Sequence, residues 1–164
     1  MPKRHQLVSY YWLVFATLAL GLLVAIYPIS SNYALLRPEF LCLFVVYWVT
    51  HTPQYFGVFI AWFAGMIQDL AEGVVWGAHA VALSIVAYIC LVAYQRIKNY
   101  SVWHQTLWIF VLVGFHQVMS NWVLGLAGYK GEPLDIIVST TVSALFWPLI
   151  FFSINRIRLH YRMY

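Results

Sequence analysis

The stretch that decides the fold is 62-WFAGMIQDLAEGVVWGAHAVALSIVAY-88, in which two apolar runs flank a short turn. Residues four apart share one face of a helix, and in the first run and just before it such a row consists of Gly57, Ala61, Gly65 and Asp69. Small residues on a face allow two membrane helices to approach closely. Gly73 and Gly77 follow in or just after the turn. We therefore expect the rest of the protein to pack around this hairpin.

The composition indicates an integral membrane protein. Of 164 residues, 63% are hydrophobic and only 9% are charged, whereas a soluble domain carries about 25% charged residues. Because the apolar runs are long and do not strictly alternate, they favour helices over a β-barrel. No polar block is large enough for a soluble domain, so we predict a single membrane domain. The first apolar run is about 20 residues, which is typical of a retained span and longer than a signal-peptide core.

Six apolar segments are candidate membrane spans. We expect them at residues 7–27, 38–52, 55–70, 76–94, 106–127 and 134–154. The second is short, about 22 Å at 1.5 Å per residue, against a hydrocarbon core of roughly 30 Å. Residues 38–70 could therefore cross the membrane once or twice. Pro53 argues against one continuous helix through this region.

The distribution of basic residues decides between five and six spans. Cytoplasmic loops are enriched in Lys and Arg. With six spans and both termini inside, seven of the nine basic residues are cytoplasmic: Lys3, Arg4, Arg96, Lys98, Arg156, Arg158 and Arg162. Five spans would leave only Lys3, Arg4 and Lys130 inside. The sequence thus predicts an all-α bundle of six transmembrane helices, N-in and C-in, with its acidic residues at or near the outer face.

Asp69 is the first candidate functional residue, because a carboxylate within a span costs free energy. It could form a buried pair or contact a partner, or it could cap the turn of the hairpin, and the sequence leaves both open. Arg37 is predicted at the same membrane depth with the opposite charge, so we hypothesise an Arg37–Asp69 pair. Together with Glu72, these residues are candidates for shaping a partner surface.

The fifth span carries four polar residues, His116, Gln117, Ser120 and Asn121. Such side chains can line a ligand cavity or form hydrogen bonds between helices, and the second interpretation is the more common one. The histidine and cysteine spacing fits no zinc motif, and no phosphate loop, nucleophile elbow or catalytic carboxylate pair is present. The basic residues form no groove pattern for nucleic acid. We expect no enzyme activity, no cofactor and no metal site.

Several of these features resemble the rod shape-determining protein MreD family. They are Arg37-Pro38 before an aromatic-rich short span, and the pattern Gly65-x-x-x-Asp69-Leu70-x-x-Gly73-x-x-x-Gly77. The resemblance implies a multi-pass subunit of the cell-elongation machinery in the bacterial inner membrane. It also implies MreC, MreB, RodA and the transpeptidase partner of RodA as partners, and a fold similar to the substrate-binding membrane subunits of energy-coupling-factor transporters.

Three functions follow as hypotheses. The first is a non-catalytic scaffold that binds MreC and helps to position or regulate peptidoglycan synthesis. The second is a small-molecule-binding subunit of a transporter, and a membrane enzyme ranks last. Cavity character separates the first two: an outward pocket lined by Gln117, Asn121 and Ser143 favours transport, and a tightly packed interior favours the scaffold.

Overall fold

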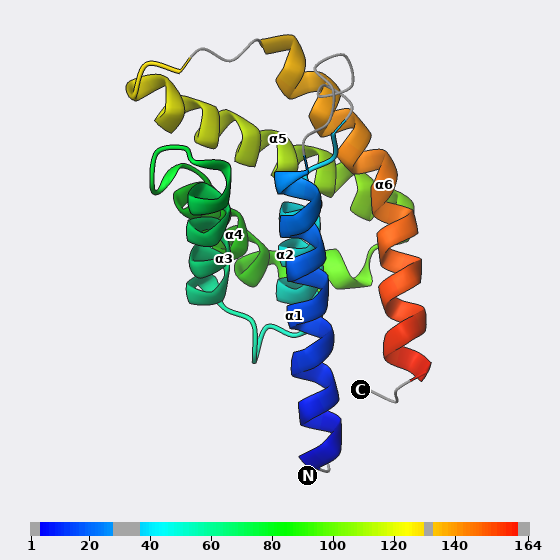
Figure 1. Cartoon of the computed structure of the whole chain (residues 1–164). Coiled ribbons are helices and arrows are strands. Elements are labelled where there is room, and N and C mark those ends of the chain that lie inside the picture. The colour runs from blue at the N-terminus through cyan, green and yellow to red at the C-terminus, as the bar shows by residue number, and fades with distance from the viewer. Residues whose placement is uncertain (1–3, 28–36, 130–132, 161–164) are drawn as a thin grey trace.

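The computed structural model describes residues 4–27, 37–129 and 133–160, except for the side chains of residues 4–10 and 160. This part of the chain forms six helices (Figure 1): α1 (Arg4–Ile26), α2 (Phe40–His51), α3 (Val58–Glu72), α4 (Ala78–Asn99), α5 (Val102–Leu126) and α6 (Pro133–His160). Each overlaps one of the segments expected from the sequence. The all-helical architecture is therefore confirmed, and α4 and α6 extend several residues beyond the ranges expected for them.

The short helix α2 lies at the centre of the bundle, so the expectation that the rest of the protein packs around the α3–α4 hairpin is wrong. Ten of its twelve residues are buried, from Leu41 to Thr50 without interruption, because α1, α4, α5 and α6 all pack around it. A helix apolar on every side is typical of such a position. This explains its length: a helix enclosed by protein does not have to match the thickness of the hydrocarbon core.

Close packing holds α1 against α2. A Cβ atom added to Gly21 would lie 3.1 Å from the Leu41 Cα and 3.0 Å from the Phe44 ring. One turn earlier, the indole Nε1 of Trp48 donates a hydrogen bond of 2.9 Å to Thr17 Oγ1. Small residues on α1 thus allow the two backbones to approach, and one buried interhelical hydrogen bond fixes their register.

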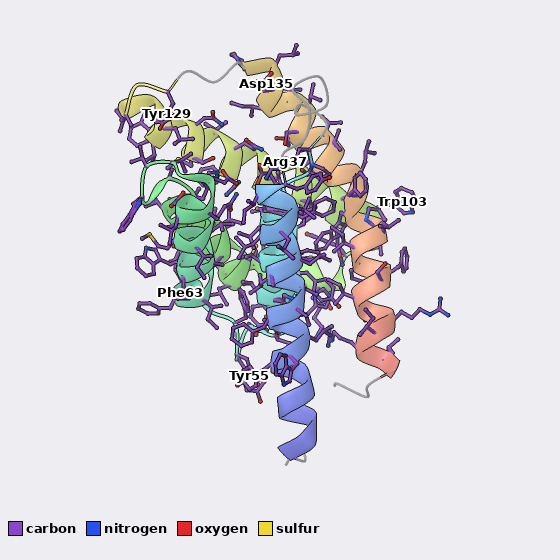
Figure 2. All side chains as sticks on the ribbon, in the orientation of Figure 1. Arg37, Tyr55, Phe63, Trp103, Tyr129 and Asp135 are labelled. Carbon is purple, nitrogen blue, oxygen red and sulfur yellow. The ribbon has the colours of Figure 1, made fainter. Side chains whose placement is uncertain are left out.

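The outer surface of the bundle is strongly apolar. On α3, the side chains of Phe59 and Phe63 are 88% and 60% exposed, and Figure 2 shows Phe63 pointing away from the other helices. Within the described residues, three helices are long and apolar enough to cross a membrane: α4, α5 and α6 up to Leu159. Tyr11–Ile26 and α2 are shorter apolar helices. These surfaces and lengths indicate a membrane protein.

The two ends of the bundle differ in charge. Figure 1 places the start of α1 and the end of α6 at the same end of the molecule. Figure 2 shows Arg37 and Asp135 at the opposite end, and Tyr55 near the end that holds the termini. The acidic residues of the described chain lie near the ends of helices where α1 is joined to α2, α3 to α4 and α5 to α6. They are Glu39, Asp69, Glu72 and Asp135. The basic residues Arg96, Lys98, Arg156 and Arg158 lie near the ends of α4 and α6.

Candidate functional site

The connection between α3 and α4 is a tight turn that requires two glycines. Gly73 ends α3 with φ 67°, and Gly77 precedes α4 with φ 104°. Both values lie in the left-handed region that residues with a Cβ rarely adopt. The peptide N–H groups of Gly73 and Val74 both donate to the carbonyl oxygen of Asp69, which closes the end of α3 in the manner of a glycine C-cap.

The Asp69 carboxylate caps the start of α4. Its Oδ2 accepts hydrogen bonds from the peptide N–H groups of Gly77 and Ala80, at 2.8 and 3.3 Å. Its Oδ1 accepts from the peptide N–H and the ring Nδ1 of His79, at 2.9 and 2.8 Å. Asp69 is fully buried. A helix N-terminus leaves N–H groups without intrahelical partners and favours negative charge, so this one residue completes both helix ends. The structure shows both capping of the turn and a buried pair, because the same carboxylate lies 2.8 Å from the ring Nδ1 of His79.

The row of small residues on α3 packs inside the bundle. A Cβ on Gly65 would overlap the backbone of Ala80, so only glycine allows α3 and α4 to approach this closely. Ala61 is completely buried. Gly57 takes no part in this packing: it is the residue before α3, and a Cβ there would meet nothing within 4 Å. Gly65 therefore packs against α4, and the buried Ala61–Gly65 face is not free for a partner helix.

The predicted Arg37–Asp69 ion pair is wrong. Arg37 Nη2 lies 4.0 Å from Glu72 Oε1, whereas the Asp69 oxygens are engaged by the start of α4. Glu72 Oε1 also accepts a 3.0 Å hydrogen bond from Gln68 Nε2, and Glu72 Oε2 lies 3.9 Å from the ring Nε2 of His79. The side chains of Arg37 and Glu72 are 30% and 23% exposed, so this pair lies near the surface, whereas Asp69 is fully buried.

A second group of hydrogen bonds joins the start of α2 to α5 and α6. The Gln117 amide donates to Glu39 Oε1 and to Ser139 Oγ, both at 3.0 Å. Ser139 Oγ in turn donates to the Arg37 carbonyl at 2.9 Å. The peptide N–H of Glu39 donates to Ser143 Oγ at 2.8 Å. Residues separated by about one hundred positions in the sequence are thus joined at one end of the bundle.

Pro38 does not begin α2 as expected. The helix starts at Phe40, and Glu39 is the residue that precedes it. The peptide N–H of Phe40 donates to the Pro38 carbonyl at 2.9 Å. Because proline lacks an N–H and fixes φ, Pro38 holds this segment in the conformation that leaves the Glu39 N–H directed at α6.

The polar face of α5 serves mainly local and interhelical contacts. Ser120 Oγ donates to the carbonyls of His116 and Gln117, and the Asn121 amide donates to the Gln117 carbonyl. The ring of His116 is 1% exposed, and neither of its nitrogens has a hydrogen-bond partner in the described chain. Its centroid lies 5.7 Å from that of His79. A buried imidazole without partners is the exception in this face.

We call these residues together the polar layer. Its members come from the start of α2, the hairpin of α3 and α4, and the facing turns of α5 and α6: Arg37, Glu39, Gln68, Asp69, Glu72, His79, His116, Gln117, Ser139 and Ser143. In the described residues, no three His, Cys, Asp or Glu side chains are arranged to hold a metal ion. The chemistry of the polar layer is that of hydrogen-bonded contact between helices.

Sequence reasoning did not select Glu39, Gln68 or His79 as site residues. Glu39 directly follows the Arg37-Pro38 pair, and His79 follows Gly77 by two positions. A signal was therefore present: both residues adjoin motif positions at predicted outer ends of spans. What the sequence lacked was the rotation of each helix, which decides whether a polar side chain faces the layer or the surface.

Comparison with known proteins identifies the family. Residues 5–157 match the model of the family described as rod shape-determining protein MreD. The chain belongs to the MreD family. A curated member, the rod shape-determining protein MreD of Haemophilus influenzae, is 28% identical over 158 residues, which cover 96% of each chain. No solved structure matches, so the expected similarity to transporter subunits stays a prediction. Membership in the MreD family supports a role in rod-shape determination.

Proposed function

We propose that the chain is a non-catalytic scaffold of the rod-shape machinery, which binds MreC and helps to position peptidoglycan synthesis. The observation that carries this proposal is the match to the MreD family over residues 5–157. The scaffold would lie in the bacterial inner membrane with six spans and both termini in the cytoplasm. The start of α1 and the end of α6 lie at one end of the bundle (Figure 1), which supports an even number of crossings, and the positive-inside rule supports a cytoplasmic location for that end.

The hydrogen bonds of the polar layer favour a scaffold over a transporter subunit. The side chains that would line an outward cavity are Gln117, Asn121 and Ser143. Gln117 and Ser143 bond to α2 and α6, and Asn121 bonds to its own helix. Ser143 is completely buried. Gln117 and Ser143 hold segments together in this way, so they are not available to a ligand without breaking the bundle.

The outward face of α3 is the surface that we assign to MreC. Its opposite face is occupied by α4, whereas Phe59, Trp62 and Phe63 are exposed. At the end of this helix, the partly exposed pair of Arg37 and Glu72 offers both charges to a segment outside the hydrocarbon core. Asp69 contributes indirectly, by fixing the hairpin that presents the surface.

The physical mechanism is positioning. Restriction of two proteins to one membrane and one complex raises their effective concentration, and a bound transmembrane helix can shift a partner between conformations. MreB, RodA and the transpeptidase partner of RodA would then be gathered directly or through MreC. None of these steps requires an acid, a base or a nucleophile on this chain.

Site-specific photocrosslinking tests the proposal. A photoreactive amino acid is placed at Phe59 or Phe63 on α3 and, as matched controls of similar exposure, at Leu107 on α5 or Phe152 on α6. We expect MreC to be captured from the α3 positions and only lipid from the controls. Capture of lipid alone from all four positions would refute the assignment of α3. If MreC does not co-purify with the full-length chain, the scaffold proposal itself is refuted.

A further inference from the structure

A polar cavity opens at the end of the bundle that holds the chain termini. It lies between the turn that joins α2 and α3, the last turns of α4, and the end of α6, and its volume is about 370 Å³. Side chains from three helices line it, including His51 and Thr52 from the end of α2, Tyr94 and Lys98 from α4, and Arg158 from α6. It is separate from the polar layer, with which it shares no residue.

The cavity is positively charged without a compensating acid in the described chain. Lys98 and Arg158 contribute two fixed charges, and both lie within electrostatic range of His51. Every ion pair found among the described residues belongs instead to the polar layer. Two cations from different helices that face one cavity repel each other, and an anion between them would offset this repulsion.

The guanidinium of Arg158 still has donors to offer. Its Nε is buried and has no hydrogen-bond partner within the described residues. Its Nη1 makes one long contact, 3.4 Å from the hydroxyl of Tyr47. Arginine presents five N–H donors in a planar fork that matches the oxygens of a phosphate. A buried donor without an acceptor costs free energy, so the side chain of Arg158, which lines the cavity, has hydrogen-bonding capacity that the described residues do not use.

The surroundings match a membrane interface. Tyrosine is enriched at the headgroup level of a bilayer, and Tyr94 lines this cavity. Lys98 and Arg158 lie near the ends of helices that are apolar enough to span the bilayer. By the positive-inside rule this end faces the cytoplasm. Basic pockets between transmembrane helices on the cytoplasmic side are suited to phosphate headgroups.

We propose that this cavity, formed by His51, Lys98 and Arg158, binds a phosphate group at the cytoplasmic surface of the membrane. Lys98 contributes a point charge, and Arg158 contributes directed hydrogen bonds. The Oγ1 atoms of Thr50 and Thr52 already donate to main-chain carbonyls of α2, so recognition falls to the cations. The same chemistry could be supplied by the headgroup of an anionic phospholipid or by a soluble phosphate.

The test uses the full chain in neutral detergent, with phosphatidylglycerol, phosphatidylcholine and inorganic phosphate as probes. Lipid binding is measured by native mass spectrometry, and thermal stability is measured with each probe. The variant K98Q/R158Q removes both cavity cations. The control R96Q/R156Q removes two charges from the same helices at exposed positions outside the cavity. Because hydrogen bonds to charged groups contribute about 1.5–3 kcal/mol, each lost cation should weaken binding roughly tenfold or more.

We expect phosphatidylglycerol to bind the native chain and the control variant, and to bind K98Q/R158Q, which lacks two cations, roughly a hundredfold more weakly. Stabilisation by inorganic phosphate beyond that by chloride at equal ionic strength would identify soluble phosphate as the source, and its absence would identify the lipid. Equal loss of binding in both double variants would overturn the proposal, because it would show only general surface charge. The single variants K98Q and R96Q, at exposed residues, give the same comparison if the double variant does not fold.

Discussion

The replacement of Asp69 by alanine tests the central role of its carboxylate. The change removes the acceptor of four hydrogen bonds, three of them from peptide N–H groups at the start of α4. His79 and Ala80 are buried, so their peptide donors would have no water to replace the carboxylate. Two stranded donors at about 1–3 kcal/mol each give roughly 2–6 kcal/mol. We expect a loss of about 4 kcal/mol in the free energy of unfolding.

The assay is equilibrium unfolding in mixed micelles, followed by the fluorescence of the eight tryptophans. The matched control is Glu72→Gln, three residues further along the same helix, whose ion pairs are long and partly exposed. Such a pair contributes no more than about 1 kcal/mol. Asp69→Asn keeps one oxygen and should fall between the two. If Asp69→Ala unfolds within about 1 kcal/mol of Glu72→Gln, the carboxylate does not hold α4 and our account of the hairpin is wrong.

Three further predictions concern packing, hydrogen bonding and the turn. Gly65→Ala should lower the free energy of unfolding by about 3 kcal/mol, because its Cβ would overlap the α4 backbone. Gly57→Ala should leave it nearly unchanged. Equal effects in the same unfolding assay would contradict this packing. Gln117→Leu should lower the free energy of unfolding by about 1–3 kcal/mol, because two interhelical hydrogen bonds are lost. Asn121→Leu should lower it less, since the Asn121 amide bonds only to its own helix. The reverse order would exclude a role for Gln117 between helices. Gly77→Ala should cost about 1–2 kcal/mol through its positive φ, and unchanged unfolding would show that the turn adapts.

The helices were predictable because their apolar runs are long and are separated by glycine, proline and charged residues. The close approach of α3 and α4 was also predictable, since Gly65 and Ala61 share a face with Asp69. The partner of that face was open in the sequence, and so was the role of Asp69. Both depend on how the helix after the turn is rotated against α3, and the spacing of residues along the chain does not determine that rotation.

The ion pair of Arg37 shows why depth alone is a weak guide. Arg37, Asp69 and Glu72 lie at similar levels, so equal depth could not choose between the two acids. The choice depends on burial: Asp69 has better donors inside the bundle, and Glu72 remains at the edge. The contact of Glu39 with Gln117 was equally hidden, because 78 residues separate the two in the chain.

The location of the Asp69 carboxylate has a consequence for biogenesis. α3 has only 15 residues, and it is not among the three helices that are long and apolar enough to cross a bilayer unaided. Its acid would be costly to leave in lipid alone. As soon as α4 emerges, however, that acid meets the N–H groups it requires. The insertion machinery would therefore release α3 and α4 into the bilayer as one preassembled pair. In that pair, α4 supplies the hydrogen-bond donors that allow α3, which is synthesised first, to enter the membrane.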